Sequence, residues 1–253
     1  MEFTDNFYLF ILIGLCAQLV DGALGMAYGL LSSTILLAMG MPPASVSASV
    51  HTAEVFTTGV SGGAHALMGN VDRKLFVRLA IPGAIGGAIG AYGLTQVPGD
   101  VIKPFVYAYL LLLAIFILLR AAGKKIQRGE VKRVPVLGFV AGLLDASGGG
   151  GWGPVATSTL LARGGNTRIT IGTVSAAEFV VSLAISLTFF FNIGLQHFDI
   201  VLGLLIGGVA AAPVAAYLVK RVSERWVLTA VGMLVLCISV YQIVSALRKA
   251  ALL

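Results

Sequence analysis

The chain has 253 residues, of which 58% are hydrophobic and 11% are charged, and its formal net charge is +6. Soluble proteins average about 45–50% apolar and about 25% charged residues, so this composition excludes an ordinary soluble domain and predicts an integral membrane protein. All 17 Lys and Arg residues lie in or beside connecting segments. Their positions therefore indicate membrane topology, and we expect no nucleic-acid partner.

The first apolar segment, residues 7–38, is interrupted between Asp21 and Gly29. It is either one long span or a hairpin that enters and leaves on the same side. Three apolar segments follow, each close to the roughly 20 residues that a transmembrane helix needs. They cover residues 43–69, 75–96 and 101–119. The polar stretch at 120–133 then predicts an exposed linker.

The same pattern begins again at residue 134, at an offset of 124 residues. The opening segment, 134–162, is interrupted between Asp145 and Gly153, and three spans follow at 169–191, 200–219 and 226–247. The aligned pairs include Asp21 and Asp145, Tyr28 and Trp152, and Glu54 and Glu178. Such matches rarely arise by chance, so we predict a duplicated chain. Its parts are a first membrane repeat (1–122), a basic linker (123–133) and a second membrane repeat (134–253).

The distribution of positive charge favours one topology. If each opening segment is a hairpin and the N-terminus lies outside, 14 of the 17 Lys and Arg residues fall on the cytoplasmic side, whereas single crossings give a split of 11 to 6. Because cytoplasmic loops are enriched in Lys and Arg, we expect a broken, re-entrant hairpin and three transmembrane helices in each half. Each half then crosses an odd number of times. The fold is therefore predicted to be an all-α, multi-pass protein of the cell (inner) membrane, with two inverted repeats and a cytoplasmic linker.

A stripe of polar residues follows the segment at 43–69. Its members are spaced three or four residues apart and share one helix face. They are Ser47, His51, Glu54, Thr58, Ser61 and His65. The equivalent segment keeps Ser175, Glu178 and Ser182. His65 and His197 lie near predicted helix ends, and the sequence assigns them no role.

A carboxylate at membrane depth is costly and usually faces a bundle interior or a wet cavity. Glu54 and Glu178 are therefore functional candidates, and the alternative for each is a protonated Glu bonded to a neighbouring helix. His51 lies one turn before Glu54, close enough for the two to share a proton. Coupling of transport to a proton is thus chemically available in the first half.

The two interruptions are rich in glycine and predict half-helices whose N-termini point to the membrane midplane. Such termini bind anions through backbone N–H groups without a basic side chain. The residues expected to contact an anion are Gly22, Gly25, Tyr28, Ser147, Gly148, Gly149, Gly150, Gly151 and Trp152. Tyr28 and Trp152 either wall a cavity or pack as core aromatics. Asp21 and Asp145 either cap the following helix or bind substrate or a proton.

These motifs resemble the sulfite exporter TauE/SafE family. The likeness rests on the two-fold repeat, on the turns that begin at Asp21 and Asp145, and on the Val50-His-Thr-Ala-Glu54 and Val174-Ser-Ala-Ala-Glu178 pair. It covers nearly the whole chain. The resemblance implies a secondary transporter, in the direction of export, of small sulfur-containing anions such as sulfite or organosulfonates.

Two other function classes remain open at this point. A cation carrier for a metal ion or Na⁺ would use the intramembrane carboxylates as oxygen ligands. An intramembrane aspartyl protease would need two aspartates in contact, whereas each Asp here is explained by a helix break, so we expect no enzyme. We expect no cofactor and no resident metal. The expected partners are the small anion, membrane lipid and a proton or Na⁺, and the sequence leaves a homo-oligomer open.

Overall fold

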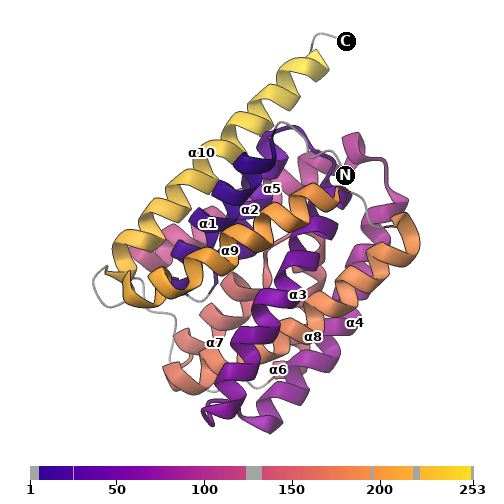
Figure 1. The fold of residues 1–253 in the computed structure, drawn as a ribbon. Helices are drawn as coiled ribbons and strands as arrows, with labels where there is room; N and C mark the ends of the chain where they lie inside the picture. The colour runs from indigo at the N-terminus through magenta and orange to yellow at the C-terminus, as the bar shows by residue number, and fades with distance from the viewer. Residues whose placement is uncertain (1–5, 25, 124–132, 195–196, 219–222, 252–253) are drawn as a thin grey trace.

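The computed structural model describes residues 6–24, 26–123, 133–194, 197–218 and 223–251. Within these ranges the chain forms helices and short connections, and no strand is present. Figure 1 shows the helices packed in one bundle, with α10 (Glu224–Ala251) extending beyond it toward the C-terminus. The prediction of an all-α membrane protein is confirmed at this level.

The described part of the first half contains five helices. They are α1 (Phe7–Leu24), α2 (Tyr28–Ala38), α3 (Pro43–Leu67), α4 (Arg73–Gln96) and α5 (Gly99–Ala121). The opening segment is thus broken between α1 and α2, where the sequence predicted an interruption. The three later helices begin and end within about two residues of the predicted spans.

The second half follows the same order at nearly the same spacing. Its elements are α6 (Val134–Gly148), the short π-helix η1 (Gly153–Thr157), α7 (Ser158–Ala162), α8 (Thr167–Ile193), α9 (Phe198–Leu218) and α10. Local signals set several helix starts. Asn166 caps α8 by accepting a hydrogen bond from the Ile169 N–H at 3.2 Å, and Asp72 caps α4 through the Leu75 N–H at 2.9 Å.

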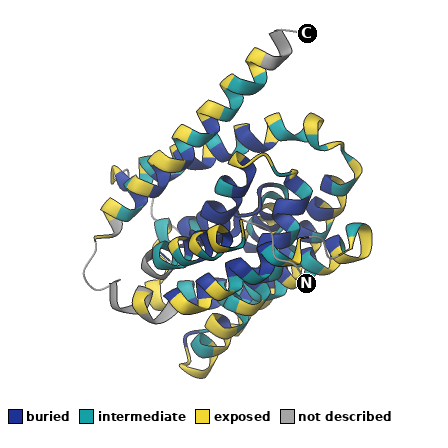
Figure 2. Cartoon of the chain, turned by 45° about the horizontal axis from the view of Figure 1, so that its top comes forward, coloured by how far each residue is buried: buried dark blue, intermediate teal, exposed yellow. Residues whose placement is uncertain are grey.

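Four helices in the described residues are long and apolar enough to cross a membrane. They are α4, α5, α8 and residues Arg225–Arg248 of α10. The helix α3 is not among them because its polar stripe lowers its hydropathy. The outer face of α4 is apolar, as a lipid-facing surface requires, with Ile81, Ile85, Ile89 and Tyr92 each 52–56% exposed. Figure 2 shows the exposed residues on the outside of the bundle and the buried ones at its centre.

Glycines let the two halves pack closely against each other. On α9, Gly203 and Gly207 lie against the backbone and side chain of Phe10 and Ile11 in α1. On α6, Gly138 lies against the backbone of Leu79 in α4, and Gly142 lies against Gly83. In the α1–α9 pair and in the α4–α6 pair, the residue numbers of the contacting positions rise together along both helices, so the two helices of each pair are parallel. The opening helix of each half thus packs on the helix of the third apolar segment of the other half, α1 on α9 and α6 on α4.

The helices α3 and α8 run antiparallel through the centre of the bundle. Gly62 lies against Ala176, Gly59 against the ring of Phe179, and Gly172 against the backbone of Asn70, just after α3 ends. The Ser175 hydroxyl donates to the Ser61 hydroxyl at 3.0 Å. Along these contacts the residue number in α3 rises as the residue number in α8 falls, so the two helices are antiparallel. The polar stripe of α3 therefore faces the polar residues of α8.

Candidate functional site

The two helix breaks are held by aspartates with the same geometry. Oδ1 of Asp21 accepts hydrogen bonds from the N–H groups of Ala27 at 2.7 Å and Tyr28 at 3.2 Å. Oδ1 of Asp145 accepts from the residues at the same offsets, Gly151 at 2.6 Å and Trp152 at 2.9 Å. N–H groups at a helix start lack partners within the helix, and a carboxylate satisfies them. Each aspartate thus joins the end of one half-helix to the start of the next.

Glycines allow the two breaks to cross at close range. A Cβ on Gly153 would lie 2.6 Å from Cα of Met26, and a Cβ on Gly150 would overlap the backbone at Leu30. Gly149 has a φ of +70°, in the left-handed region that favours glycine, and its N–H donates to the Asp145 carbonyl at 2.7 Å. These glycines are therefore required by close approach and by the turn.

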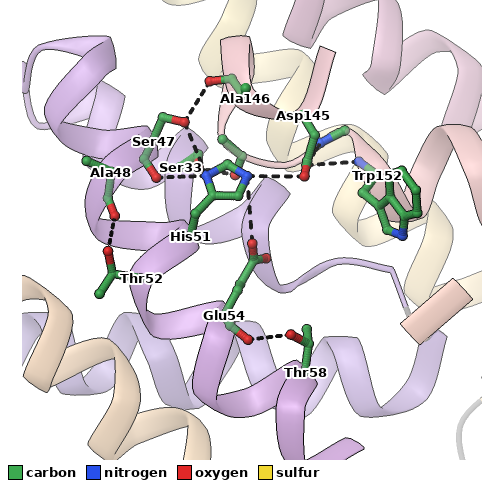
Figure 3. Close-up of polar contacts among 12 residues, drawn as sticks. Ser33, Ser47, Ala48, His51, Thr52, Glu54, Thr58, Asp145, Ala146 and Trp152 are labelled. Carbon is green, nitrogen blue, oxygen red and sulfur yellow. Dashed lines mark hydrogen bonds and ion pairs between the residues drawn. The ribbon is translucent and has the colours of Figure 1, made fainter. Parts of the chain in front are cut away.

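His51 links α3 to the second break. Its Nε2 lies 3.1 Å from Oδ2 of Asp145 and 3.9 Å from Oε2 of Glu54, and its Nδ1 lies 2.8 Å from the Ser47 carbonyl oxygen. The Ser47 hydroxyl donates to the Ala146 carbonyl at 2.6 Å. Figure 3 shows the imidazole between the two carboxyl groups. His51 therefore contacts a residue 94 positions away in the sequence as well as its neighbour on α3.

The Glu54 side chain is buried, with 3% of the residue exposed, and its Oε2 has no hydrogen-bond partner within the described residues. A Cβ on Gly29, in the first turn of α2, would lie 2.5 Å from Oε1 of Glu54. The backbone carbonyl of Glu54 accepts a hydrogen bond from the Thr58 hydroxyl at 2.5 Å. The carboxyl group thus lies directly against the start of α2 with one oxygen uncommitted.

A cavity of about 200 Å³ lies where both breaks meet α3 and α8. Its lining residues are Gln18, Asp21, Met26, Tyr28, Gly29, Leu30, Glu54, Thr57, Thr58, Ser61, His65, Asp145, Gly150, Gly153, Pro154, Ile171, Ser175 and Glu178. At one end Ser61 is exposed, and at the other Glu54 is buried. The cavity therefore runs from the surface at the C-terminal end of α3 to the two breaks.

The structure brings many of the predicted site residues into this lining, from both halves. Those that line the cavity are Asp21, Tyr28, Glu54, Thr58, Asp145, Gly150, Ser175 and Glu178. Sequence reasoning missed Gln18, Thr57, Gly153, Pro154 and the position of His65. Gln18 had a signal, since it lies one helical turn before Asp21 in otherwise apolar sequence.

Other predicted residues lie behind the cavity wall. The described ones outside the lining are Ser147, Gly148, Gly149, Gly151 and Trp152, together with His51. The Ser147 hydroxyl donates to the Leu143 carbonyl at 2.8 Å, one turn back in α6. Gly22 lies in α1, and Gly25 falls outside the described residues. The second break thus presents Gly150, Gly153 and Pro154 to the cavity rather than its whole glycine run.

The two aromatic residues after the breaks are buried and their polar groups are occupied. The Tyr28 hydroxyl donates to the Leu204 carbonyl at 2.8 Å, and Nε1 of Trp152 donates to the Val174 carbonyl at 3.1 Å. Tyr28 is 4% exposed and Trp152 is 0% exposed. Tyr28 lines the cavity with its ring, whereas Trp152 packs between the second break and α8. Each ring positions its half-helix against a helix of the same or the other repeat.

The acidic side chains of the lining do not form a recognisable metal centre. Within the described residues, no group of three or more His, Cys, Asp or Glu side chains has an arrangement that holds a metal ion. Oδ1 of each aspartate is already bonded to backbone N–H groups. The cavity is instead surrounded by hydroxyl groups, by the first turn of α2 and by Glu54 and Glu178.

Comparison with known proteins identifies relatives. The family model described as Sulfite exporter TauE/SafE matches residues 10–242, which confirms the resemblance. The chain is 46% identical over 223 residues to "Probable membrane transporter protein YtnM" of Bacillus subtilis (strain 168), covering 84% of this chain and 74% of that protein. It is 28% identical over 179 residues to "Probable membrane transporter protein ORF9" of Sinorhizobium sp, covering 66% and 60%. No solved structure matches.

Proposed function

This chain belongs to the sulfite exporter TauE/SafE family of membrane transporters, and we propose that it exports a small sulfur-containing anion, such as sulfite or an organosulfonate, through the cavity between the two helix breaks. The observation that carries the proposal is the cavity itself, which is lined by residues of both breaks and both central helices. Binding sites at paired breaks of duplicated halves are typical of secondary transporters.

Hydrogen-bond donors in the lining suit an anion. Gly29 and Leu30 belong to the first turn of α2, and Gly153 opens η1, so their N–H groups lie at the positive ends of short helices. The N–H groups of Gly151 and Trp152, which the sequence also suggested, already donate to Asp145. We therefore place the anion against Gly29, Leu30 and Gly153, with hydroxyl groups of α3 on the opposite side.

Glu54 and Glu178 in the lining couple the binding of the anion to the binding of a proton. An ionised carboxylate only accepts hydrogen bonds and repels an anion, whereas a protonated one donates. Oε2 of Glu54 has no hydrogen-bond partner in the described structure, so a proton there would be available to the substrate. A divalent anion carried with one proton keeps a net negative charge, which an inside-negative potential drives outward by about 2.3 kcal/mol per 100 mV. The proposed mechanism is therefore cotransport of anion and proton.

Transport of the proposed anion is tested in liposomes that contain the purified protein. Uptake is measured for sulfite, thiosulfate, sulfate, organosulfonates and carboxylates, each with and without imposed proton and Na⁺ gradients. We expect uptake of sulfite or an organosulfonate that increases when the outside is acidic. A cation carrier is the second candidate because four carboxyl groups line the cavity. Transport of Na⁺ or a divalent cation, with none of the anions moved, would establish that alternative instead.

Filling the cavity at Gly29 should block anion binding. The Gly29→Val side chain would enter the space between Oε1 of Glu54 and the Gly149 carbonyl, which lie 2.5 and 2.9 Å from a Cβ at this position. We expect at least about 10²-fold weaker sulfite binding, because two or more charge-assisted hydrogen bonds are lost. Gly63→Ala is the matched control, since no atom lies within 4 Å of its Cβ. If folded Gly29→Val protein binds sulfite with unchanged affinity, the anion does not bind at Gly29.

We also propose that the two repeats are inverted, with the linker in the cytoplasm. The antiparallel direction of α3 and α8 supports this, because these helices are equivalent at the offset of 124 residues. Met41 and Gly165 precede them at equivalent positions. Single cysteines at these positions, in a chain with Cys16→Ser and Cys237→Ser, should react with an impermeant maleimide from opposite sides of the membrane. Reaction of both from one side would contradict the inverted topology.

A further inference from the structure

His65 occupies the surface end of the cavity and is held there by the turn that follows α3. Its backbone carbonyl accepts from the Asn70 N–H at 2.9 Å, and its Nδ1 lies 3.3 Å from Nδ2 of Asn70. Asn70 is buried, with 4% exposed. The side-chain amide nitrogen of Asn is a donor, so Nδ1 of His65 accepts and the hydrogen of the neutral ring is on Nε2. The imidazole thus has one nitrogen occupied by the fold and one free to donate.

The charge of the lining is divided between its two ends. Among the described lining residues, His65 is the one side chain that is able to carry a positive charge. Of the four carboxyl groups in the lining, those of Glu54 and Asp145 are buried, with 3% and 2% of each residue exposed. Arg168, near the start of α8, lies close enough for its charge to act on His65. An anion that enters beside His65 therefore meets the neutral imidazole, with the Arg168 charge nearby, before it reaches the carboxyl groups of Glu54 and Asp145.

The second repeat has no counterpart of this arrangement. The residues equivalent to His65 and Asn70 at the offset of 124 are Phe189 and Gly194. Because α3 and α8 are antiparallel, His65 and Phe189 lie at opposite ends of the helix pair. Phe189 is 1% exposed and belongs to a core cluster against which Ala44 and Ala48, at the start of α3, are packed. One end of the α3–α8 pair thus carries a hydrogen-bond donor in the cavity lining, whereas the equivalent residue at the other end is a buried apolar ring.

We propose that His65 is an anion ligand at the mouth of the cavity, on the side of the α3–α4 turn only, and that Asn70 is the residue that positions its ring. This rests on the proposed anion transport. The substrate's oxygen accepts a hydrogen bond from Nε2 of His65 before it reaches the breaks. The ligand contributes to recognition from one face of the membrane, since Phe189 supplies no donor at the other. An anion that enters from the side of the α3–α4 turn therefore meets a hydrogen-bond donor that an anion entering from the opposite side does not meet.

The test measures KM for sulfite in right-side-out and inside-out vesicles that contain the protein. Met68→Cys, at a residue 65% exposed in the α3–α4 turn, reports with an impermeant maleimide which vesicles expose that turn. In those vesicles His65→Phe should raise KM at least about tenfold, the loss expected for one charge-assisted hydrogen bond. His65→Gln, which keeps a donor, should recover most of the affinity, and Asn70→Ala should give an intermediate KM. In vesicles of the opposite orientation, KM should be unchanged.

His197→Asn serves as the control. His197 is outside the lining and has a φ of 56°, which Asn tolerates, so this variant should behave as the wild type in both orientations. An equal change of KM from both sides, no change in His65→Phe, or an equal loss in His65→Phe and His65→Gln would overturn the role of His65 while anion transport itself stands. If the wild-type chain moves no sulfite or organosulfonate, the proposed function fails, and this proposal fails with it.

Discussion

Glu54→Gln should abolish sulfite uptake driven by a pH gradient while exchange of labelled for unlabelled sulfite continues. The amide of Gln donates a hydrogen bond to the anion, as a protonated carboxyl would, but it does not release or accept a proton. Oε2 of Glu54 is buried without a hydrogen-bond partner in the described residues, and it lies 3.9 Å from Nε2 of His51, which is near enough to pass a proton to it. We expect gradient-driven uptake to fall at least about tenfold, whereas the exchange rate changes by less than about threefold.

Glu178→Gln is the matched control because Glu178 is the equivalent residue and lines the same cavity. The position equivalent to His51 is Ser175, whose hydroxyl donates to Ser61. Glu178 therefore lacks a titratable neighbour on its own helix, and its replacement should lower sulfite affinity severalfold without removing the response to pH. If both variants respond normally to the pH gradient, or if Na⁺ alone drives uptake, Glu54 is not the coupling group.

The parts of this fold that sequence predicted well are those with a local signal. Apolar length placed the helices, and the aspartates and glycines at 21–29 and 145–153 placed both breaks. The spacing of Glu54 from His51 predicted their shared helix face. Each of these signals depends on residues within a few turns of one another. Periodicity and composition are sufficient for such features because the backbone geometry of a single helix is known in advance.

What sequence did not predict depends on contacts between the halves. His51 reaches Asp145 only because α3 packs beside the second break, and nothing near His51 in the sequence indicates this. For Trp152 the sequence left open whether it walls a cavity or packs as a core aromatic; its indole donates to the Val174 carbonyl and the residue lies outside the lining, because the direction of a side chain at a helix start depends on its neighbours. His65 belongs to the polar stripe, but the sequence assigned it no role, and its place at the cavity follows from the turn that packs Asn70 against Gly172.

The contact between His51 and Asp145 also makes the two breaks unequal in an otherwise repeated design. Both aspartates use Oδ1 to hold two N–H groups, but Oδ2 of Asp145 additionally lies 3.1 Å from a buried imidazole. The residue equivalent to His51 in the second half is Ser175, on α8. The second break is therefore joined to α3 and the proposed coupling group, whereas the first break is not. Stability measurements should detect this difference.

Asp145→Ala should destabilise the protein more than Asp21→Ala. It leaves the N–H groups of Gly151 and Trp152 without their acceptor and the ring of His51 without its partner, and each unsatisfied buried polar group costs about 1–3 kcal/mol. Asp21→Ala removes an acceptor from only two backbone donors. We expect an apparent Tm in detergent at least about 2 °C lower for Asp145→Ala than for Asp21→Ala, since about 1 kcal/mol shifts the Tm of a chain of this size by about 2–4 °C.

A double-mutant cycle attributes that difference to one contact. In a His51→Ala background, Asp145→Ala and Asp21→Ala should lower the Tm by nearly equal amounts, because the imidazole that distinguishes the two breaks is absent. The coupling between His51 and Asp145 should then be about 1 kcal/mol or more, as is usual for directly bonded residues. Additive effects of His51→Ala and Asp145→Ala, or equal losses for the two aspartates in the wild-type background, would show that the imidazole does not stabilise the second break. His51 would then act through Glu54 alone, and the asymmetry of the transporter would reside in the cavity rather than in its helix breaks.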